Sequence, residues 1–262
     1  MSQQLPPFFH EIFHPSLPRL GPGDDASTIR ALDMAFERLR RRPVPLESGH
    51  LRILDIGCGT GAQTIQLARY TGESIVAVDN HQPYLDELAR RASATGLSDR
   101  IKPRLGDMHA LGMDRESFDI VWAEGCLFVM GFREGLAACH DLLVPRGIMG
   151  ASEMVWLADD PPTECRDYFM ETYPAITGIE SNLEAIRRAG FEVVGHFILP
   201  ESSWLTPFYQ PLEKRLLSLR PECVGDDDKL GLIDSIQHEI DIFRKYSAYF
   251  GYAFYIMQRK ES

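Results

Sequence analysis

Short apolar segments alternate with longer amphipathic segments from residue 51 to the end of the chain. Apolar runs bounded by glycine, proline and acidic residues favour buried strands, and apolar residues three and four positions apart favour helices. The expected strands are residues 51–56, 74–79, 101–105, 118–123, 148–153, 191–199 and 253–258. The expected helices between them are about 61–70, 83–96, 132–143 and 181–190. This alternation predicts a doubly wound α/β fold with a mostly parallel, seven-stranded sheet.

Two segments do not follow this alternation. Residues 24–41 have the pattern of one helix, for which Asp24, Asp25 and Ser27 are candidate N-caps. Residues 200–250 have the pattern of two helices separated by the acidic run Asp226-Asp-Asp228. We expect these helices, from the N-terminus and from residues 200–250, to form a cap over the strand ends.

Composition and charge narrow the class of protein. Hydrophobic residues make up 44% of the 262 residues, which is enough for a sizeable core. The formal net charge is -11, and the one basic run, Arg38 to Arg42, falls at the end of an expected helix, where cations complement the helix dipole. Nucleic-acid-binding proteins usually have a basic patch or stripe, so we expect no nucleic-acid partner.

The cysteines and the hydropathy pattern favour the cytoplasm. The five cysteines are odd in number and include no C-x-x-C pair, so we expect neither a disulfide framework nor a metal site. No basic segment followed by an apolar run marks a signal peptide. No apolar run approaches the ~18 residues that a membrane span needs. We therefore expect a cytoplasmic protein without a membrane span.

The most informative motif is Leu54-Asp-Ile-Gly-Cys-Gly-Thr-Gly61, at the end of the first expected strand. Its alternating glycines suit a tight turn between a strand and a helix, where a ligand approaches the main chain closely. Residues 57–62 also satisfy the dinucleotide pattern G-x-G-x-x-G/A, so the glycines alone do not identify the ligand. Asp55 favours S-adenosylmethionine over a dinucleotide, because a carboxylate there would repel a diphosphate and attract the ammonium and sulfonium groups of S-adenosylmethionine.

Three further strand ends carry candidate ligand contacts, because ligands of open parallel sheets bind outside the carboxyl ends of the strands. Asp79 ends the second strand 18 residues after Gly61, an offset at which an acid accepts hydrogen bonds from ribose hydroxyls. The third strand is followed by Gly106-Asp-Met108 and the fourth by Glu124-Gly125. We expect these residues to meet the glycine turn at one edge of the sheet.

The motif at residues 54–61 resembles motif I of the class I S-adenosylmethionine-dependent methyltransferases. The resemblance implies a Rossmann-like methyltransferase fold, S-adenosyl-L-methionine as cofactor and S-adenosyl-L-homocysteine as product. It also implies that Asp79 binds the ribose, that Asp107 accepts a hydrogen bond from the adenine amino group and that Met108 contacts the ring. The expected cofactor-binding residues are Asp55, Ile56, Gly57, Cys58, Gly59, Thr60, Gly61, Asp79, Asn80, Gly106, Asp107, Met108, Glu124 and Gly125.

The rest of the chain is similar to a narrower group. Glu124-Gly125, residues 191–204 and residues 249–257 resemble a bacterial and archaeal subgroup of small-molecule methyltransferases related to the ubiquinone/menaquinone-biosynthesis type. Gly21-Pro-Gly23 also matches that subgroup, and we expect it to close over the cofactor. The fourth strand is not followed by the Asp/Asn-Pro-Pro-aromatic motif of amino-methylating nucleic-acid enzymes. The expected organisation is a single methyltransferase domain (1–262) made of an N-terminal cap segment (1–45), a cofactor-binding core (46–199), a helical cap (200–250) and a final strand (251–262).

Methyl transfer sets few demands on side chains. Transfer from a sulfonium is an in-line displacement, which needs alignment and the exclusion of water rather than a metal or a covalent catalyst. A general base is needed only if the nucleophile arrives protonated. Glu124, Glu153 and Glu201 are the candidates for base or substrate contact, and Glu124 could instead bind the cofactor. The tyrosines that could line a pocket or surround a cation, although packing is their commoner role, are Tyr168, Tyr173 and Tyr209.

Two other functions stay open: an NAD(P)-dependent oxidoreductase on a related fold, and a non-catalytic protein that binds S-adenosylmethionine. Asp55 and Gly106-Asp107 disfavour the first, and the expected cap favours a substrate chamber over the second. The expected partner is a small-molecule methyl acceptor, whose reacting atom could be oxygen, nitrogen, carbon or sulfur. The oligomeric state is open, with a homodimer as one option.

Overall fold

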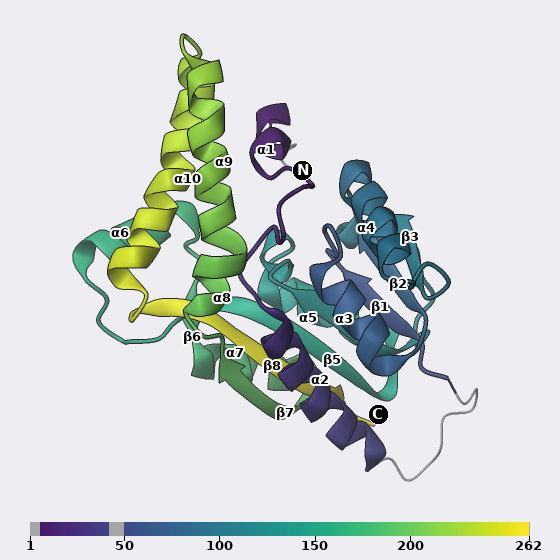
Figure 1. Cartoon of the computed structure of the whole chain (residues 1–262). Helices are drawn as coiled ribbons and strands as arrows, with labels where there is room; N and C mark the ends of the chain where they lie inside the picture. Colours follow the sequence, from purple (N-terminus) through teal and green to yellow (C-terminus); the bar gives the residue numbers. More distant parts are fainter. Residues whose placement is uncertain (1–5, 42–49, 262) are drawn as a thin grey trace.

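A central sheet organises the chain, which the computed structural model describes over residues 6–41 and 50–261 (Figure 1). The strand order is β3-β2-β1-β4-β5-β8-β7, and a short strand, β6, pairs with β5 beside this path. The strands are β1 (Ile53–Ile56), β2 (Ile75–Asp79), β3 (Ile101–Leu105), β4 (Phe118–Glu124), β5 (Leu143–Trp156), β6 (Thr177–Gly178), β7 (Phe191–Ile198) and β8 (Phe250–Arg259). Among the strands of the described residues, β8 alone runs antiparallel to its neighbours, β5 and β7. The predicted doubly wound, mostly parallel sheet is confirmed.

The strand order reverses between β1 and β4. The chain moves outward from β1 to β2 and β3, and then returns to add β4 on the other side of β1. Every residue of β1 is buried, since the strand lies between two others and helices cover the sheet. Ligands of doubly wound folds bind at such a switch point, outside the carboxyl ends of the strands. The reversal therefore brings the ends of β1, β2 and β4 together.

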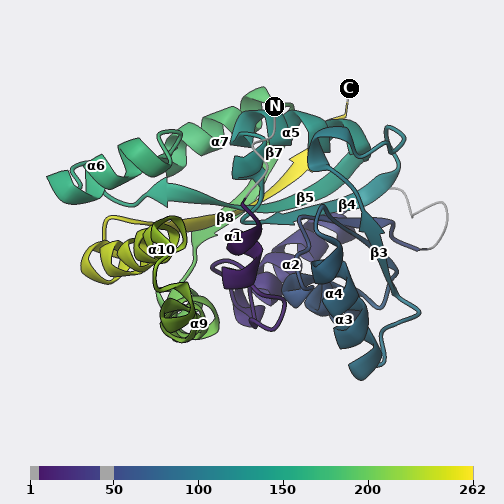
Figure 2. The same cartoon turned by 90° about the horizontal axis from the view of Figure 1, so that it is seen from above.

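Helices cover both faces of the sheet, as the view from above shows (Figure 2). α2, α3 and α4 lie on one face, and α5 and α7 lie on the other. α2 begins at the predicted N-cap Asp24, whose carboxylate accepts a hydrogen bond from the Ser27 N–H at 2.7 Å. The bounds are α2 (Asp25–Arg40), α3 (Ala62–Thr71), α4 (Gln82–Ala94), α5 (Phe132–Leu142), α7 (Ile179–Arg188) and the short helices η1 (Met108–Ala110) and η2 (Leu127–Val129).

The C-terminal helices form a pair that rises beside the sheet (Figure 1). They are α8 (Ser202–Trp204), the π-helical turn η3 (Leu205–Tyr209), α9 (Gln210–Leu219), η4 (Arg220–Cys223) and α10 (Asp227–Tyr246). Asp226 begins α10 by accepting a hydrogen bond from the Lys229 N–H at 3.1 Å, at the acidic break that the sequence predicts. The N-terminal helix α1 (Pro7–Ile12) packs against both α9 and α10.

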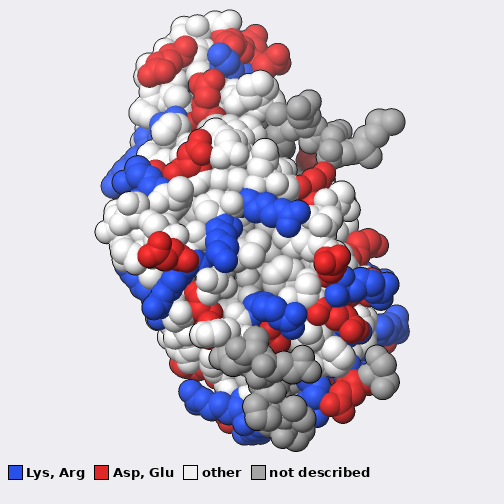
Figure 3. Space-filling model, turned by 90° about the vertical axis from the view of Figure 1, so that its right-hand side faces the viewer, with Lys and Arg blue, Asp and Glu red and all other residues white. Residues whose placement is uncertain are grey.

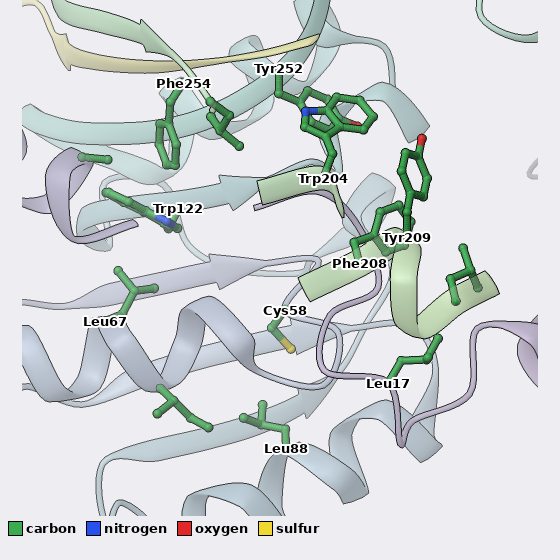
Figure 4. Close-up of a cluster of buried hydrophobic side chains, with 14 of the residues drawn as sticks. Leu17, Cys58, Leu67, Leu88, Trp122, Trp204, Phe208, Tyr209, Tyr252 and Phe254 are labelled. Atoms are coloured by element: carbon green, nitrogen blue, oxygen red, sulfur yellow. The ribbon is translucent and has the colours of Figure 1, made fainter. Parts of the chain in front are cut away.

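Aromatic side chains join this helix pair to the sheet. Trp204 stacks on Tyr252 of β8, with ring centroids 5.0 Å apart, and on Phe243 of α10, at 4.5 Å. Figure 4 shows Trp204 and Tyr209 close to Tyr252, in the same buried cluster as Trp122 of β4. The C-terminal helices therefore share a hydrophobic core with the sheet. Their role as a cap over a binding site stays a prediction.

The structure differs from the sequence pattern in several local features. α1 and α6 (Thr163–Thr172) have no counterpart among the predicted helices. The helix expected at residues 181–190 begins earlier than predicted, because α7 begins at Ile179 after Gly178, directly where β6 ends. The side chain of Asn182 is engaged elsewhere, since it hydrogen-bonds to Thr177 at 3.0 Å and to Tyr255 at 3.3 Å.

The surface carries charges of both signs. Acidic and basic side chains are interspersed on the face shown in Figure 3.

Over the described residues, no helix is long and apolar enough to cross a membrane. The expected boundary between the N-terminal segment and the core, at residues 45–46, lies outside the described residues.

Candidate active site

The glycine turn connects β1 to α3 and forms the floor of the candidate site. Gly57, Gly59 and Gly61 have φ values of 65°, 51° and 86°, a region that favours glycine. A methyl group added at Gly61 would lie 2.1 Å from Leu88 Cδ1 on α4, and one at Gly57 would lie 2.8 Å from Cys126 Sγ. Close packing thus demands glycine at both positions, and the turn is held tightly between α4 and the end of β4.

Asp55 lies behind this turn, not on its surface. Its carboxyl group is fully buried, and it accepts hydrogen bonds from Thr64 Oγ1 at 2.6 Å and from Gln63 Nε2 at 3.3 Å. Burial raises the pKa of Asp55 to about 8, and the nearby carboxylates of Glu124 and Asp79 also raise it. The assignment of Asp55 as a cofactor-binding residue stays a prediction. From beneath the turn, Asp55 holds the start of α3 through Thr64 and Gln63.

Asp79 lies at the end of β2, directly against the glycine turn. Its carboxylate accepts hydrogen bonds from the Gly59 N–H at 2.9 Å and from the His81 N–H at 3.0 Å. Burial raises the pKa of Asp79, although these N–H groups favour its charged form. A carboxylate therefore already occupies the anion-binding N–H of the glycine turn. This arrangement opposes a diphosphate at the same place.

The end of β3 adjoins the end of β2. The Gly106 N–H donates to the Asp79 carbonyl oxygen at 3.0 Å. This bond places residues 106–108 beside Asp79, the residue predicted to bind the ribose. Met108 reaches the glycine turn, because its Cε lies 3.8 Å from the position of a methyl group on Gly57. Asp107 and Asn80 are exposed, and the Asp107 carboxylate accepts from the His109 N–H at 2.9 Å. The strand ends thus bring together the predicted adenosine-binding residues.

Glu124 ends β4 and is held by three donors. Its carboxylate accepts from Thr28 Oγ1 at 2.7 Å, from Trp122 Nε1 at 2.9 Å and from Arg19 Nη1 at 3.4 Å. Only 6% of its side chain is exposed, and that of Arg19 is equally enclosed at 8%. Of these three donors, Arg19 is also a cationic partner. The roles of Glu124 as a base and as a cofactor-binding residue both stay predictions.

Residues 19–23, which we call the N-terminal strap, cross the site. Leu20 Cδ1 lies 3.1 Å from the position of a methyl group on Gly59, and a methyl group on Gly23 would lie 3.5 Å from Glu124 Oε2. The Gly23 N–H also donates to the Ser203 carbonyl oxygen at 3.1 Å, which ties the strap to the C-terminal helices. The sequence indicated the glycines of this segment but missed Arg19, because a lone arginine before a proline-rich turn gives no signal.

Two histidines next to Asp79 also escaped the sequence analysis. His10 of α1 stacks on His81 at the start of α4, with ring centroids 3.8 Å apart and an angle of 5° between the rings. Tyr84 Oη donates to the Phe13 carbonyl oxygen at 2.7 Å. Burial lowers the pKa of both histidines. These contacts hold α1 over the end of β2. They could not be predicted from a sequence motif, because α1 itself was not predicted.

Glu153 and Glu201 have very different surroundings. Glu153 of β5 is 3% exposed and accepts from Tyr173 Oη at 2.8 Å and from the Met154 N–H at 3.1 Å. Burial raises the pKa of Glu153 to about 7. Glu153 therefore combines burial with a pKa suited to proton transfer near neutral pH. Glu201, by contrast, is exposed.

No group of three or more His, Cys, Asp and Glu side chains that could hold a metal ion occurs within residues 6–41 and 50–261. The five cysteines are all buried and free. The polar groups of the site are thus the carboxylates at the strand ends and their donors.

Comparison with known sequences links this site to a family. Residues 53–147 match a family model described as a methyltransferase domain. Among curated relatives, the sterol 24-C-methyltransferase of Neurospora crassa is 29% identical over 176 residues, which cover 63% of this chain and 46% of the relative. The chain therefore spans less than half the length of that relative.

Solved structures share the fold. The S-adenosylmethionine-dependent methyltransferase from Thiobacillus denitrificans, in complex with S-adenosyl-L-homocysteine, has a TM-score of 0.73 and 19% identity and aligns over 98% of this chain and 100% of its own. The cyclase SpnF has a TM-score of 0.68 and 23% identity and aligns over 91% of this chain and 81% of its own. At these identities the likeness establishes the fold alone. The segment that matches the methyltransferase-domain model contains the glycine turn and the ends of β2, β3 and β4.

Proposed function

We propose that the protein transfers a methyl group from S-adenosyl-L-methionine to a small-molecule acceptor. The observation that carries this proposal is the contact between the Asp79 carboxylate and the Gly59 N–H, at 2.9 Å. It puts negative charge where a dinucleotide would need to place its phosphates. Asp55 lies beneath the same turn, where a bound cation would favour its ionised form.

The adenosine part of the cofactor fits the ends of β2 and β3. Asp79 would accept hydrogen bonds from the ribose hydroxyls, with Asn80 beside it. Met108 lies close to Gly57 and would cover the adenine ring, and the exposed Asp107 carboxylate would accept from the adenine amino group. Cys58, Thr60 and Ile56 are buried, so they would shape the turn rather than offer side chains to the ligand.

The amino-acid part of the cofactor fits the pair formed by Arg19 and Glu124. The two side chains present opposite charges 3.4 Å apart at the mouth of β4, next to Gly125. An α-amino acid carries an ammonium and a carboxylate of matching signs. Glu124 would hold the ammonium and Arg19 the carboxylate, and the strap would close over them. Arg19 is thus a cofactor-binding residue to add to the predicted set.

The bound cofactor supplies an activated methyl group on its sulfonium, which is transferred by in-line displacement and leaves S-adenosyl-L-homocysteine. The protein positions the reactants and excludes water from the site. The strap, through Leu20 and Gly23, covers the glycine turn and the β4 end and keeps water out. Well-oriented reactants gain roughly 7–11 kcal/mol from such positioning. Glu153, beyond the β4 end, would take up a proton if the acceptor carries one.

The comparisons indicate the class of the methyl acceptor only broadly. The relative in Neurospora crassa is a sterol 24-C-methyltransferase, which supports a small organic acceptor rather than a macromolecule. The ubiquinone/menaquinone-related subgroup and a homodimer remain proposals. The cyclase SpnF illustrates that this fold also occurs in a protein named for another reaction.

Calorimetric titration with S-adenosylmethionine, S-adenosylhomocysteine and NAD tests the cofactor. We expect the first two to bind and NAD to show no heat of binding. Asp79→Ala should weaken S-adenosylmethionine binding at least about tenfold, which corresponds to about 1.4 kcal/mol. Asp99→Ala, at an exposed acid on the loop before β3, is the matched control and should bind normally. Unchanged affinity in Asp79→Ala, or binding of NAD alone, would refute the proposal.

Catalysis needs a second measurement. The protein should release S-adenosylhomocysteine when S-adenosylmethionine is supplied with a pool of small metabolites. A protein that binds the cofactor tightly but releases none over all pools would be a binding protein, and the enzymatic part of the proposal would fail.

A further inference from the structure

A second group of polar side chains lies beyond the β4 end, on elements from distant parts of the chain. We call it the acid–tyrosine cluster: Glu153 of β5, Tyr173 after α6, Tyr209 of η3, Glu239 of α10 and Tyr252 of β8. Tyr173 Oη donates to Glu153 Oε1, and Tyr209 Oη donates to Glu239 Oε1, both at 2.8 Å. Tyr252 lies near both of these pairs. Burial raises the pKa of its hydroxyl, and the nearby carboxylates of Glu153 and Glu239 raise it further.

The two acids of this cluster have no cationic partner. Within the described chain, Glu153 accepts only from Tyr173 and the Met154 N–H, and Glu239 accepts only from Tyr209. By contrast, the buried Glu124 has the guanidinium of Arg19. Taking a carboxylate out of water without a counter-ion is costly, and burial accordingly raises the pKa of both glutamates. A ligand with a positive charge would supply the missing partner.

Tyr252 gives an independent sign of a missing ligand. The residue is 6% exposed, and over the described part of the chain its hydroxyl takes part in no hydrogen bond. The Oη atom lies 3.8 Å from the position of a methyl group on Gly125, so it points to the end of β4. The position next to Gly125 makes the methyl acceptor the natural partner for Tyr252.

Aromatic and apolar groups surround the cluster. Trp204 stacks on Tyr252 at 5.0 Å, and Phe128 meets the edge of the Tyr173 ring at 6.2 Å. Aromatic faces attract cations. Phe128 is 48% exposed and its neighbour Val129 is 50% exposed, although both are apolar. An acceptor with a cationic head and an apolar body would match the buried acids and this exposed apolar pair together.

We propose that the acid–tyrosine cluster binds the methyl acceptor, and that the acceptor is an amine with a protonated nitrogen on an apolar body. The proposal rests on the proposed methyltransferase function. Glu153 accepts the proton of the ammonium, which frees the nitrogen lone pair. That lone pair forms the new N–C bond while the methyl–sulfur bond breaks, and sulfur keeps the electron pair of the broken bond. Tyr252 orients the nitrogen towards the β4 end.

A matched pair of ligands tests the charge requirement. Octylamine and 1-octanol are titrated into the complex of the protein with S-adenosylhomocysteine, and the reaction of each with S-adenosylmethionine is followed by mass spectrometry. We expect octylamine to bind at least about tenfold more tightly than octanol, a difference of about 1.4 kcal/mol. Octylamine should gain one methyl group. Equal affinities, or methylation of a sterol such as ergosterol but of no amine, would overturn the inference.

Variants locate the site. Glu153→Gln and Tyr252→Phe should each lower the affinity for octylamine about tenfold or more and leave the affinity for S-adenosylhomocysteine unchanged. The matched control is Glu171→Gln, at an exposed glutamate of α6, which should change neither. Retained S-adenosylhomocysteine binding also proves that each variant is folded. If both cluster variants bind octylamine like the wild type, the amine site lies elsewhere and the inference is wrong. Failure of the wild type to bind S-adenosylhomocysteine would instead refute the methyltransferase proposal itself.

Discussion

Arg19 Nη1 lies 3.4 Å from Glu124 Oε2, although the two residues are 105 positions apart in the chain. The contact joins the N-terminal strap to the end of β4. Both side chains are buried, so each would cost stability without the other. The pair has the charge pattern of an amino-acid receptor, and this gives the first prediction.

Arg19→Ala should lower the affinity for S-adenosylhomocysteine at least about tenfold but leave the affinity for adenosine unchanged. The reason is that the guanidinium would hold only the amino-acid part of the ligand. Calorimetry with the two ligands measures the difference. Arg133→Ala, at an exposed residue of α5, serves as the control. A loss of affinity for both ligands would indicate a general collapse of the site and not a carboxylate contact.

Gly61→Ala should destabilise the protein severely. The residue has φ of 86°, and the added methyl group would lie 2.1 Å from Leu88 Cδ1. We expect a loss of about 2 kcal/mol or more in the free energy of unfolding. Gly231→Ala is the contrasting variant, because Gly231 lies in α10 with open space around it, and alanine there should stabilise by about 0.5–1 kcal/mol. Denaturant unfolding measures both, and equal stabilities of the two variants would contradict the packing described for the turn.

Stability should fall with rising pH because of Glu153. Its pKa is about 7 in the folded protein, raised by burial from an ordinary value of 4.5. A raised carboxyl pKa means that folding favours the protonated form, so this contribution is fully present below about pH 4.5 and is lost as the pH rises to about 7. Glu153→Gln should therefore gain stability relative to the wild type between pH 5 and pH 8, by at most roughly 3 kcal/mol. Thermal unfolding at both pH values, with Glu171→Gln as control, measures this; a constant difference across pH would exclude the effect.

Cofactor binding should strengthen with pH because of Asp55. Its pKa of about 8 in the free protein means that it is largely protonated at neutral pH. A bound sulfonium and ammonium favour the ionised acid, so the affinity for S-adenosylmethionine should rise between pH 6.5 and pH 8.5. In Asp55→Asn this rise should be smaller. Calorimetry in buffers of different ionisation enthalpy also reports the released proton. The same pH dependence in both proteins would assign it to other groups.

The strand ends of the candidate site were predictable because their signals are local. The glycine turn, Asp79 and residues 106–108 follow apolar runs directly, and the alternation of strands and helices places such ends at one edge. Asp55 was placed correctly along the chain, but its burial behind the turn depends on Thr64 and Gln63 of the next helix. Sequence position alone does not tell on which side of a tight turn a carboxylate lies.

Contacts between distant segments could not be predicted from the sequence. The strap meets the site through Arg19, and α1 meets α4 through the stacked His10 and His81. Neither segment has a periodic pattern that fixes its place over the sheet. Glu201 illustrates the same limit, since its position after a strand suggested the site whereas its side chain is exposed.

The most direct test of the account is a crystal structure of the protein grown with S-adenosylhomocysteine. It should show the ribose hydroxyls on Asp79, the adenine beside Met108, and the amino-acid part between Arg19 and Glu124. A nucleoside bound away from these strand ends, or a dinucleotide with its phosphates over residues 57–61, would contradict it.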